Sequence, residues 1–191
     1  MLERFDEEKN GSSAYNTESL KRAGLVLTLA AWETYVKNRF NEEIEVWLFS
    51  VKGSQLGHFV QRKVDEDLKR FFNPNTAKTK QLFKAYFDID VTESWKWDNY
   101  YPSQAKKVLD QFVSMRGDAA HQANTNQQQA HLVKREDLAK AIRFIKGLVR
   151  AMDEVSIAKR CSHLNAALCA IHPPLILVGE SHVRNVYETC C

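Results

Sequence analysis

The sequence predicts an all-α protein, built as a bundle of about five helices and followed by a C-terminal tail of different character. Apolar residues recur at steps of three and four through most of the first 158 residues, which is the spacing of one face of an α-helix. Before Lys159 there is no alternation of apolar and polar residues of the kind that marks a half-buried strand. We therefore expect a helical domain over residues 1–158 and a tail over residues 159–191.

Residues 16–51 predict a long first helix. Asn16 is a suitable N-cap, and Glu18 suits the positive end of the helix dipole in the first turn. One face collects apolar residues at helical spacing, namely Val26, Leu29, Val36, Phe40, Ile44, Trp47 and Val51. Glu33 falls on this same face. A carboxylate there is either buried against a cationic partner or turned toward solvent at a less buried part of the face.

Four further helices and an ordered loop follow along the chain. A second helix is expected over residues 59–72 and ends before Pro74, because proline disfavours helix in the residue before it. A shorter helix starts at Thr76, and the aromatic stretch "DIDVTESWKWDNYYP" is interpreted as an ordered, packed loop. Pro102 suits the first turn of the next helix. That helix has the apolar face Ala105, Val108, Leu109, Phe112 and Met115, and a last helix starts near Glu136.

Composition limits the class of protein more than it identifies a function. The formal net charge of +3 neither announces nor forbids nucleic-acid binding. The apolar runs "GLVLTLAAW" and "PPLILVG" are too short to cross a bilayer, and the charged N-terminus has no signal-peptide core. All four cysteines lie within the last 31 residues, so no disulfide framework spans the body. We expect a cytoplasmic protein without a membrane partner.

The stretch "QFVSMRGDAAHQ" places Arg116 and His121 near the end of the helix that starts at Pro102. Successive helical residues are about 100° apart, so five steps put these positions about 140° apart on an unbroken helix. For both to serve one site, the helix must be interrupted at Gly117, or a second copy of the chain must complete the site, or both. The structural alternative is an arginine paired with a carboxylate and a histidine that caps the helix.

These residues resemble the HEPN domains, many of which are ribonucleases marked by an arginine followed, after a short spacer, by a histidine. Arg116 and His121 match that motif with four residues between them. "LAAWETYVKNRF" is similar to the first long helix of the family with its glutamate, and "RFFNPNTAKTKQLFKAYFDIDVTESWKW" is similar to the middle of the RiboL-PSP-HEPN branch. The likeness covers roughly residues 16–156. One position departs: a polar residue often follows the arginine in this family, whereas here Gly117 does, with Asp118 one step later.

The resemblance implies a metal-independent endoribonuclease that acts as a homodimer, with Arg116 and His121 of both copies around one RNA phosphate. It implies a 2′,3′-cyclic phosphate and a free 5′-hydroxyl as products. It also implies a toxin or antiviral defence role with an antitoxin or other regulatory partner. The alternative is a non-catalytic HEPN module that binds RNA or nucleotide, or serves as a dimerisation adaptor.

Other residues are assigned supporting roles, each beside a simpler interpretation. We expect Glu33 to orient Arg116, and Asp118 either to assist the site or to serve as a turn or cap residue. Arg143, Lys146 and Arg150 lie along one side of the last helix, where they either follow an RNA backbone or form a solvated face. Base stacking competes with core packing as the role of four aromatic residues, namely Trp95, Trp97, Tyr100 and Tyr101.

We expect no metal and no cofactor. The body contains no HExxH motif and no paired CxxC motif. In the tail, Cys161, His163, Cys169 and His172 form a CxH…CxxH arrangement that matches no known zinc fold, and an atypical terminus explains it better.

Overall fold

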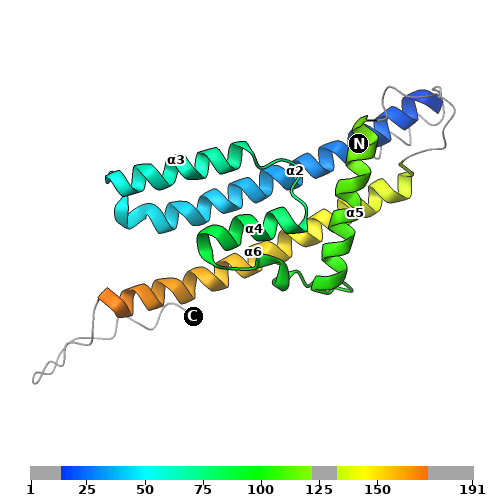
Figure 1. The fold of residues 1–191 in the computed structure, drawn as a ribbon. Coiled ribbons are helices and arrows are strands. Elements are labelled where there is room, and N and C mark those ends of the chain that lie inside the picture. Colours follow the sequence, from blue (N-terminus) through cyan, green and yellow to red (C-terminus); the bar gives the residue numbers. More distant parts are fainter. Residues whose placement is uncertain (1–13, 122–132, 172–191) are drawn as a thin grey trace, which may run out of the picture. The chain divides into compact units, whose positions relative to one another are not determined.

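The computed structural model describes residues 14–121 and 133–171, which form five α-helices and two short 3-10 helices (Figure 1). In chain order these are α2 (Ala14–Leu48), η1 (Phe49–Val51), α3 (Gln55–Lys69), α4 (Thr76–Phe87), η2 (Val91–Ser94), α5 (Pro102–His121) and α6 (Arg135–Ile171). This part of the chain contains no β-strand, only an isolated bridge between Trp97 and Tyr100. The predicted all-α class is confirmed.

Helix α2 buries one stripe of side chains along most of its length. The buried positions are Leu25, Leu29, Trp32, Val36, Phe40 and Ile44, at steps of three or four residues. The predicted face is therefore correct through its middle but wrong at Trp47, which is 50% exposed. The predicted N-cap is also wrong, because α2 begins at Ala14 and places Asn16 inside the helix.

Helix α3 begins earlier and ends earlier than the sequence predicts. Ser54 is its N-cap, and the hydroxyl of Ser54 accepts a hydrogen bond from the backbone N–H of Gly57 at 3.1 Å. The helix ends at Lys69, so Phe72 lies beyond it and is 57% exposed, whereas Phe71 is buried. Phe72 was expected to be the last residue of this helix, and that expectation is wrong.

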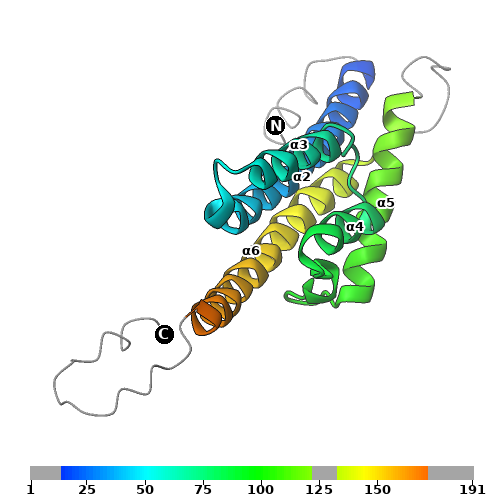
Figure 2. The same ribbon diagram turned by 60° about the vertical axis from the view of Figure 1, so that its left-hand side comes forward.

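Helix α4 begins at Thr76, as predicted, and its first residue is hydrogen-bonded to α5, which lies next to it (Figure 2). Asn75 caps it by accepting a hydrogen bond from the backbone N–H of Lys78 at 2.9 Å. The backbone N–H of Thr76 donates to Asp110 at 2.8 Å, and its hydroxyl donates to the carbonyl of Lys106 at 3.0 Å. These bonds fix the start of α4 against the middle of α5.

The aromatic segment between α4 and α5 is packed, as predicted. Trp95 is fully buried, and its ring meets that of Trp32 edge to face with centroids 6.1 Å apart. The rings of Trp97 and Tyr100 stack with centroids 4.9 Å apart, and both contact Phe144 of α6. These three aromatic side chains therefore help to build the core.

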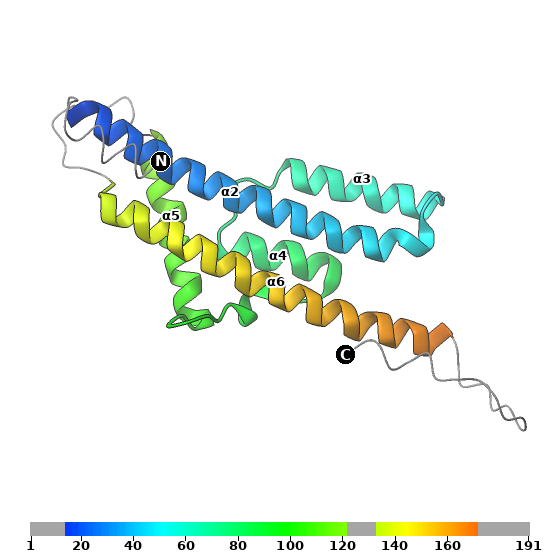
Figure 3. The same cartoon turned by 180° about the vertical axis from the view of Figure 1, so that it is seen from behind.

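Helices α2 and α6 run side by side, seen clearly from behind (Figure 3), and a polar cluster joins them. The hydroxyl of Tyr35 donates to Asp153 at 2.6 Å and to the carbonyl of Val149 at 3.2 Å. Arg39 lies 3.6 Å from the same Asp153 carboxylate and also pairs with Glu42 and Glu43 on α2. Every charged member of the cluster thus has an oppositely charged neighbour.

Contacts divide the chain into Met1–Ser156 and Ile157–Cys191. Helix α6 spans this division and continues to Ile171, which takes it into the segment predicted as a tail. The "PPLILVG" stretch and His172 lie outside the described residues. Within the described helices, none has both the length and the apolar character that crossing a membrane requires.

Candidate functional site

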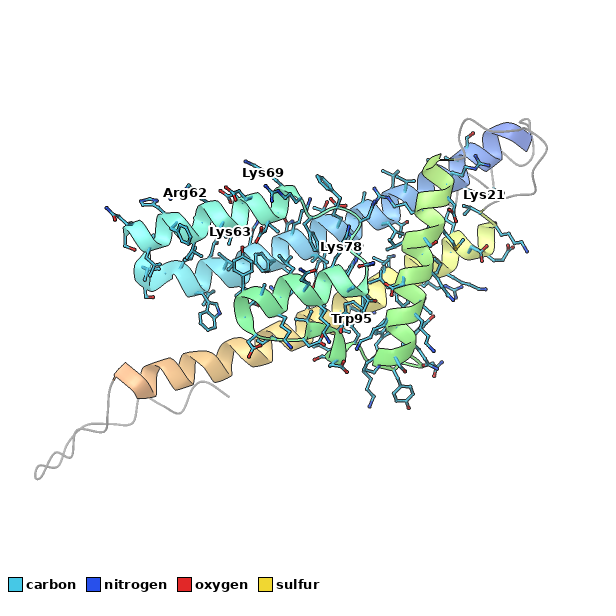
Figure 4. The ribbon with its side chains drawn as sticks, in the orientation of Figure 1. Lys21, Arg62, Lys63, Lys69, Lys78 and Trp95 are labelled. Carbon is cyan, nitrogen blue, oxygen red and sulfur yellow. The ribbon has the colours of Figure 1, made fainter. Side chains whose placement is uncertain are left out.

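The last turns of α5 lie at the same end of the first unit as the first half of α2 and the start of α6 (Figures 1 and 3). Each of these helices brings basic residues to that end, namely Lys21, Arg22, Arg116 and Arg135. Figure 4 shows Lys21 on the stretch of α2 that passes this end. Lys21 is only 6% exposed although lysine is rarely buried. Acidic residues lie on the same stretches, namely Glu18 on α2, Asp118 on α5, and Glu136 and Asp137 on α6, so charges of both signs meet at this end of the helical unit.

Helix α5 continues without interruption from Pro102 to His121, so there is no break at Gly117. Positions 116 and 121 consequently lie about 140° apart around one helix axis. Of the two routes to a common site, interruption at Gly117 is therefore wrong, and completion by a second copy stays a prediction. His121 is the last residue of α5, and its side chain lies outside the described part of the structure.

The guanidinium of Arg116 is incompletely paired. The side chain is half-buried, and its Nη1 atom is buried without a hydrogen-bond partner. No ion pair within 4.0 Å joins Arg116 to any carboxylate of the described residues. Buried donors that lack a partner are rare in native proteins, and each exception needs an explanation such as a catalytic role or a bound water or ion. Arg39 Nε and Trp95 Nε1 are the other such atoms among the described residues. The alternative of a simple structural ion pair is therefore not what the described residues show for Arg116.

Glu33 is influenced by the charge of Arg116, but the hydrogen bonds that its carboxylate accepts come from other groups. Its Oε1 accepts from Lys37 Nζ at 2.9 Å, and its Oε2 accepts from the backbone N–H of Asn73 at 3.0 Å. Burial by itself raises the pKa of Glu33. The bonds from Lys37 and Asn73, with the charges of Lys37 and Arg116, outweigh that effect and lower the pKa below its usual 4.5. Arg116 therefore acts on Glu33 through space, without a direct hydrogen bond between them among the described contacts.

The remaining candidates are exposed and separate from Arg116. Asp118 is exposed on α5, one step beyond Gly117. On α6, exposed cations stand at helical spacing on one side, namely Arg143, Lys146 and Arg150. Arg143 bonds only within its own helix, to the carbonyl of Ala139 at 3.4 Å. The structure thus brings Glu33 into the field of Arg116 but does not bring this row of cations into contact with it.

The hydrogen-bonded group of Glu33, Lys37 and the backbone of Asn73 was not predicted from the sequence. Only the i,i+4 spacing of Glu33 and Lys37 indicated a part of it. The described residues hold no cluster of three or more histidine, cysteine, aspartate or glutamate side chains arranged to bind a metal ion. The side chains of the CxH…CxxH arrangement lie outside the described residues.

A family model places the chain among known proteins. The model of the RiboL-PSP-HEPN domain matches residues 2–158, which covers α2 to α5 and the first part of α6. No curated protein and no solved structure matches the chain. Families of HEPN domains often contain ribonucleases. With its all-α fold and a family match over most of its length, the chain belongs to the RiboL-PSP-HEPN family.

Proposed function

We propose that the chain is a metal-independent endoribonuclease in which Arg116 and His121 act on one RNA phosphate. The observation that carries the proposal is the Arg116 guanidinium, which is half-buried near the end of α5 with its Nη1 atom lacking a hydrogen-bond partner. A guanidinium can donate two parallel hydrogen bonds to a phosphate group. A phosphate oxygen is therefore a suitable partner for Nη1 of Arg116.

The side chains of Arg116 and His121 can supply every protein group that the reaction needs. The 2′-hydroxyl of RNA attacks the adjacent phosphorus, the 2′-oxygen–phosphorus bond forms, and the bond from phosphorus to the 5′-oxygen breaks. Histidine titrates near neutral pH, so His121 can take the proton from the 2′-hydroxyl or give one to the leaving 5′-oxygen. Arg116 stabilises the charge that develops on the phosphorane oxygens. The products are a 2′,3′-cyclic phosphate and a 5′-hydroxyl.

We further propose that the active form is a homodimer. Because α5 is helical from Pro102 to His121, positions 116 and 121 of one chain face different directions. A two-fold axis near the end of α5 would bring Arg116 of one chain toward His121 of the other. The complete site would then hold two arginines and two histidines around a single phosphate.

Cleavage of total RNA in EDTA, followed by mapping of the cut ends, tests the activity. Wild type is expected to leave cyclic phosphates and 5′-hydroxyls, and Arg116→Ala and His121→Ala are each expected to lose at least about 100-fold in rate. The matched controls are Arg62→Ala and His58→Ala, which alter an exposed arginine and histidine on α3. Cleavage by folded Arg116→Ala and His121→Ala at the wild-type rate would refute the assignment.

A mixing experiment tests the shared site. Arg116→Ala and His121→Ala proteins, each inactive alone, are unfolded together, refolded and assayed. A mixed dimer retains one intact arginine and one intact histidine on different chains, so activity is expected to return if the two residues meet across the interface. No recovery from a verified mixed dimer would mean that one arginine and one histidine on different chains do not suffice, which contradicts a site completed by a single such pair.

A non-catalytic module that binds RNA or nucleotide is the second candidate, and the open space at Gly117 favours it. No described atom lies within 4 Å of a Cβ built there, although a polar side chain often follows the arginine in the family that the sequence resembles. If wild type binds RNA, loses that binding in Arg116→Ala and cuts no RNA, this second function replaces the first.

A further inference from the structure

The loop between α3 and α4 is held rigidly at three successive backbone groups. The carbonyl of Phe72 accepts from Lys78 Nζ at 2.7 Å, the N–H of Asn73 donates to Glu33 at 3.0 Å, and the carbonyl of Pro74 accepts from the buried indole of Trp32 at 3.0 Å. Asn73 takes a left-handed conformation with φ of 50°, which asparagine tolerates better than most residues. The backbone on both sides of Phe72 therefore has one defined path.

This rigid loop presents an aromatic ring to solvent. Phe72 is 57% exposed, while its neighbours Phe71 and Pro74 are buried. The ammonium of Lys37 lies over one face of the Phe72 ring, 5.2 Å from its centroid. Because Phe72 remains more than half exposed beside this lysine, part of the ring is accessible to a ligand. A single exposed apolar side chain is ordinary on a protein surface, so exposure alone does not indicate that Phe72 binds a ligand. Its position relative to the candidate site is the informative observation.

That position is next to the proposed catalytic arginine. The Glu33 carboxylate that accepts the N–H of Asn73 is also the one whose pKa the charge of Arg116 helps to lower. The chain that leaves this loop is bonded to the helix of Arg116, since the N–H of Thr76 donates to Asp110 of α5 at 2.8 Å. Arg116 follows Asp110 by six residues, about 9 Å along the helix axis. Figure 4 shows Lys78 at the start of α4, in the region between α2 and α5. Lys37 thus contacts the Phe72 ring and Lys78 contacts its carbonyl, on a loop whose following residues are bonded to the helix that carries Arg116.

We infer that Phe72 stacks against a base of the RNA next to the phosphate that Arg116 holds, with Lys37 contacting the backbone. This inference rests on the proposed function, and it defines the substrate as single-stranded or looped-out RNA. A base that is paired inside a duplex cannot expose its face to a ring. Stacking is tolerant of sequence because every base has a π-face, so Phe72 favours unpaired RNA without selecting one base.

The test measures binding separately from cleavage. A fluorescent single-stranded RNA of mixed sequence is titrated into full-length protein that carries His121→Ala, so that no RNA is cut. In this background Phe72→Ala is expected to weaken binding by about 5- to 150-fold, the range found for loss of one stacked base. Phe72→Trp is expected to bind as tightly as Phe72, whereas Phe72→Leu, which keeps apolar bulk, is expected to behave like Phe72→Ala.

Phe59 provides a matched control. It is 59% exposed and lies near the start of α3, ten residues before the last residue of that helix, Lys69. This spacing corresponds to about 15 Å along α3, and Figure 1 shows the start of α3 at the end away from α5. Phe59→Ala is therefore expected to bind like the parent protein. Equal affinities of Phe72→Ala and Phe59→Ala, with both folded, overturn the inference.

Two RNA probes separate stacking from indirect effects. An RNA backbone of the same length without bases is expected to bind the parent and Phe72→Ala proteins equally, because it offers nothing to stack. If Phe72→Ala loses as much affinity for this backbone as for the intact RNA, Phe72 acts through the loop or through Lys37, and the inference is wrong. The binding assay needs no cleavage. If wild type cuts no RNA but Phe72→Ala weakens binding only to RNA that has bases, then Phe72 stacks on a base and only the catalytic proposal is refuted.

Discussion

The carboxylate of Glu33 accepts a hydrogen bond from the backbone N–H of Asn73 at 3.0 Å, and the two residues are 40 positions apart in the chain. Glu33 stands at the edge of the buried stripe of α2, with its side chain 17% exposed. From there it binds Lys37 on its own helix, holds the α3–α4 loop and interacts with the charge of Arg116. One side chain thus links three parts of the candidate site.

Replacing this carboxylate is expected to make stability depend less on pH. Since the pKa of Glu33 is lowered in the folded state, the carboxylate stabilises the fold at neutral pH. That contribution is lost as pH falls through the usual glutamate range near 4.5 and below. Glu33→Gln should therefore lower the free energy of unfolding by about 0.5–1.5 kcal/mol at pH 7, with a smaller difference at pH 4. Urea denaturation at several pH values measures it. Glu66→Gln, an exposed position on α3, is the control, and an equal loss there would contradict the assignment.

Two helical glycines are expected to respond to alanine with opposite signs. At Gly117 an added Cβ meets no described atom within 4 Å, so Gly117→Ala should raise the free energy of unfolding by about 0.5–1 kcal/mol through helix propensity. At Gly147 the added Cβ would lie 2.1 Å from Nε1 of Trp97, so Gly147→Ala should destabilise the fold by about 1–3 kcal/mol. Thermal and urea unfolding check both, and a shared sign would show that the packing of α5 or α6 differs from that described.

Trp32 and Trp95 are both buried and contact each other, but loss of the indole nitrogen is expected to lower the free energy of unfolding by different amounts at the two positions. The indole of Trp32 donates to the buried carbonyl of Pro74, whereas Nε1 of Trp95 is buried without a partner. Both substitutions by phenylalanine remove similar volume. Trp32→Phe should therefore cost about 1–3 kcal/mol more than Trp95→Phe, because only Trp32→Phe leaves a buried acceptor unpaired. Equal losses of unfolding free energy would mean that the bond to Pro74 does not stabilise the loop.

The exposed cations of α6 are expected to affect RNA affinity through charge alone. If Arg143, Lys146 and Arg150 follow the RNA backbone, the triple alanine variant should bind all single-stranded sequences more weakly. The slope of log affinity against log salt should then fall by about 0.7 for each phosphate that the variant no longer neutralises. Lys63→Ala, which removes a cation paired with Asp67 on α3, is the control. An unchanged salt slope in the triple variant would leave these residues as a solvated face.

Local signals predicted most of the secondary structure. Thr76 after Asn75 and Pro102 after an aromatic loop mark helix starts that the structure confirms, because capping and proline geometry depend on neighbouring residues alone. The same reasoning erred at Phe72, where a continued helical spacing concealed the end of α3 at Lys69. Periodicity cannot distinguish the last residue of a helix from the first residue of the loop that follows.

The sequence by itself determined the all-α class, the order of the helices and the placement of Arg116 and His121 five steps apart on one of them. Tertiary structure decided the partners of Glu33 and the exposure of Phe72. Helix formation depends on residues within one or two turns of each other, so it can be predicted from short stretches of sequence. The meeting of Glu33 with Asn73 depends on how α2 and the α3–α4 loop pack, and side-chain volumes throughout the core set that packing.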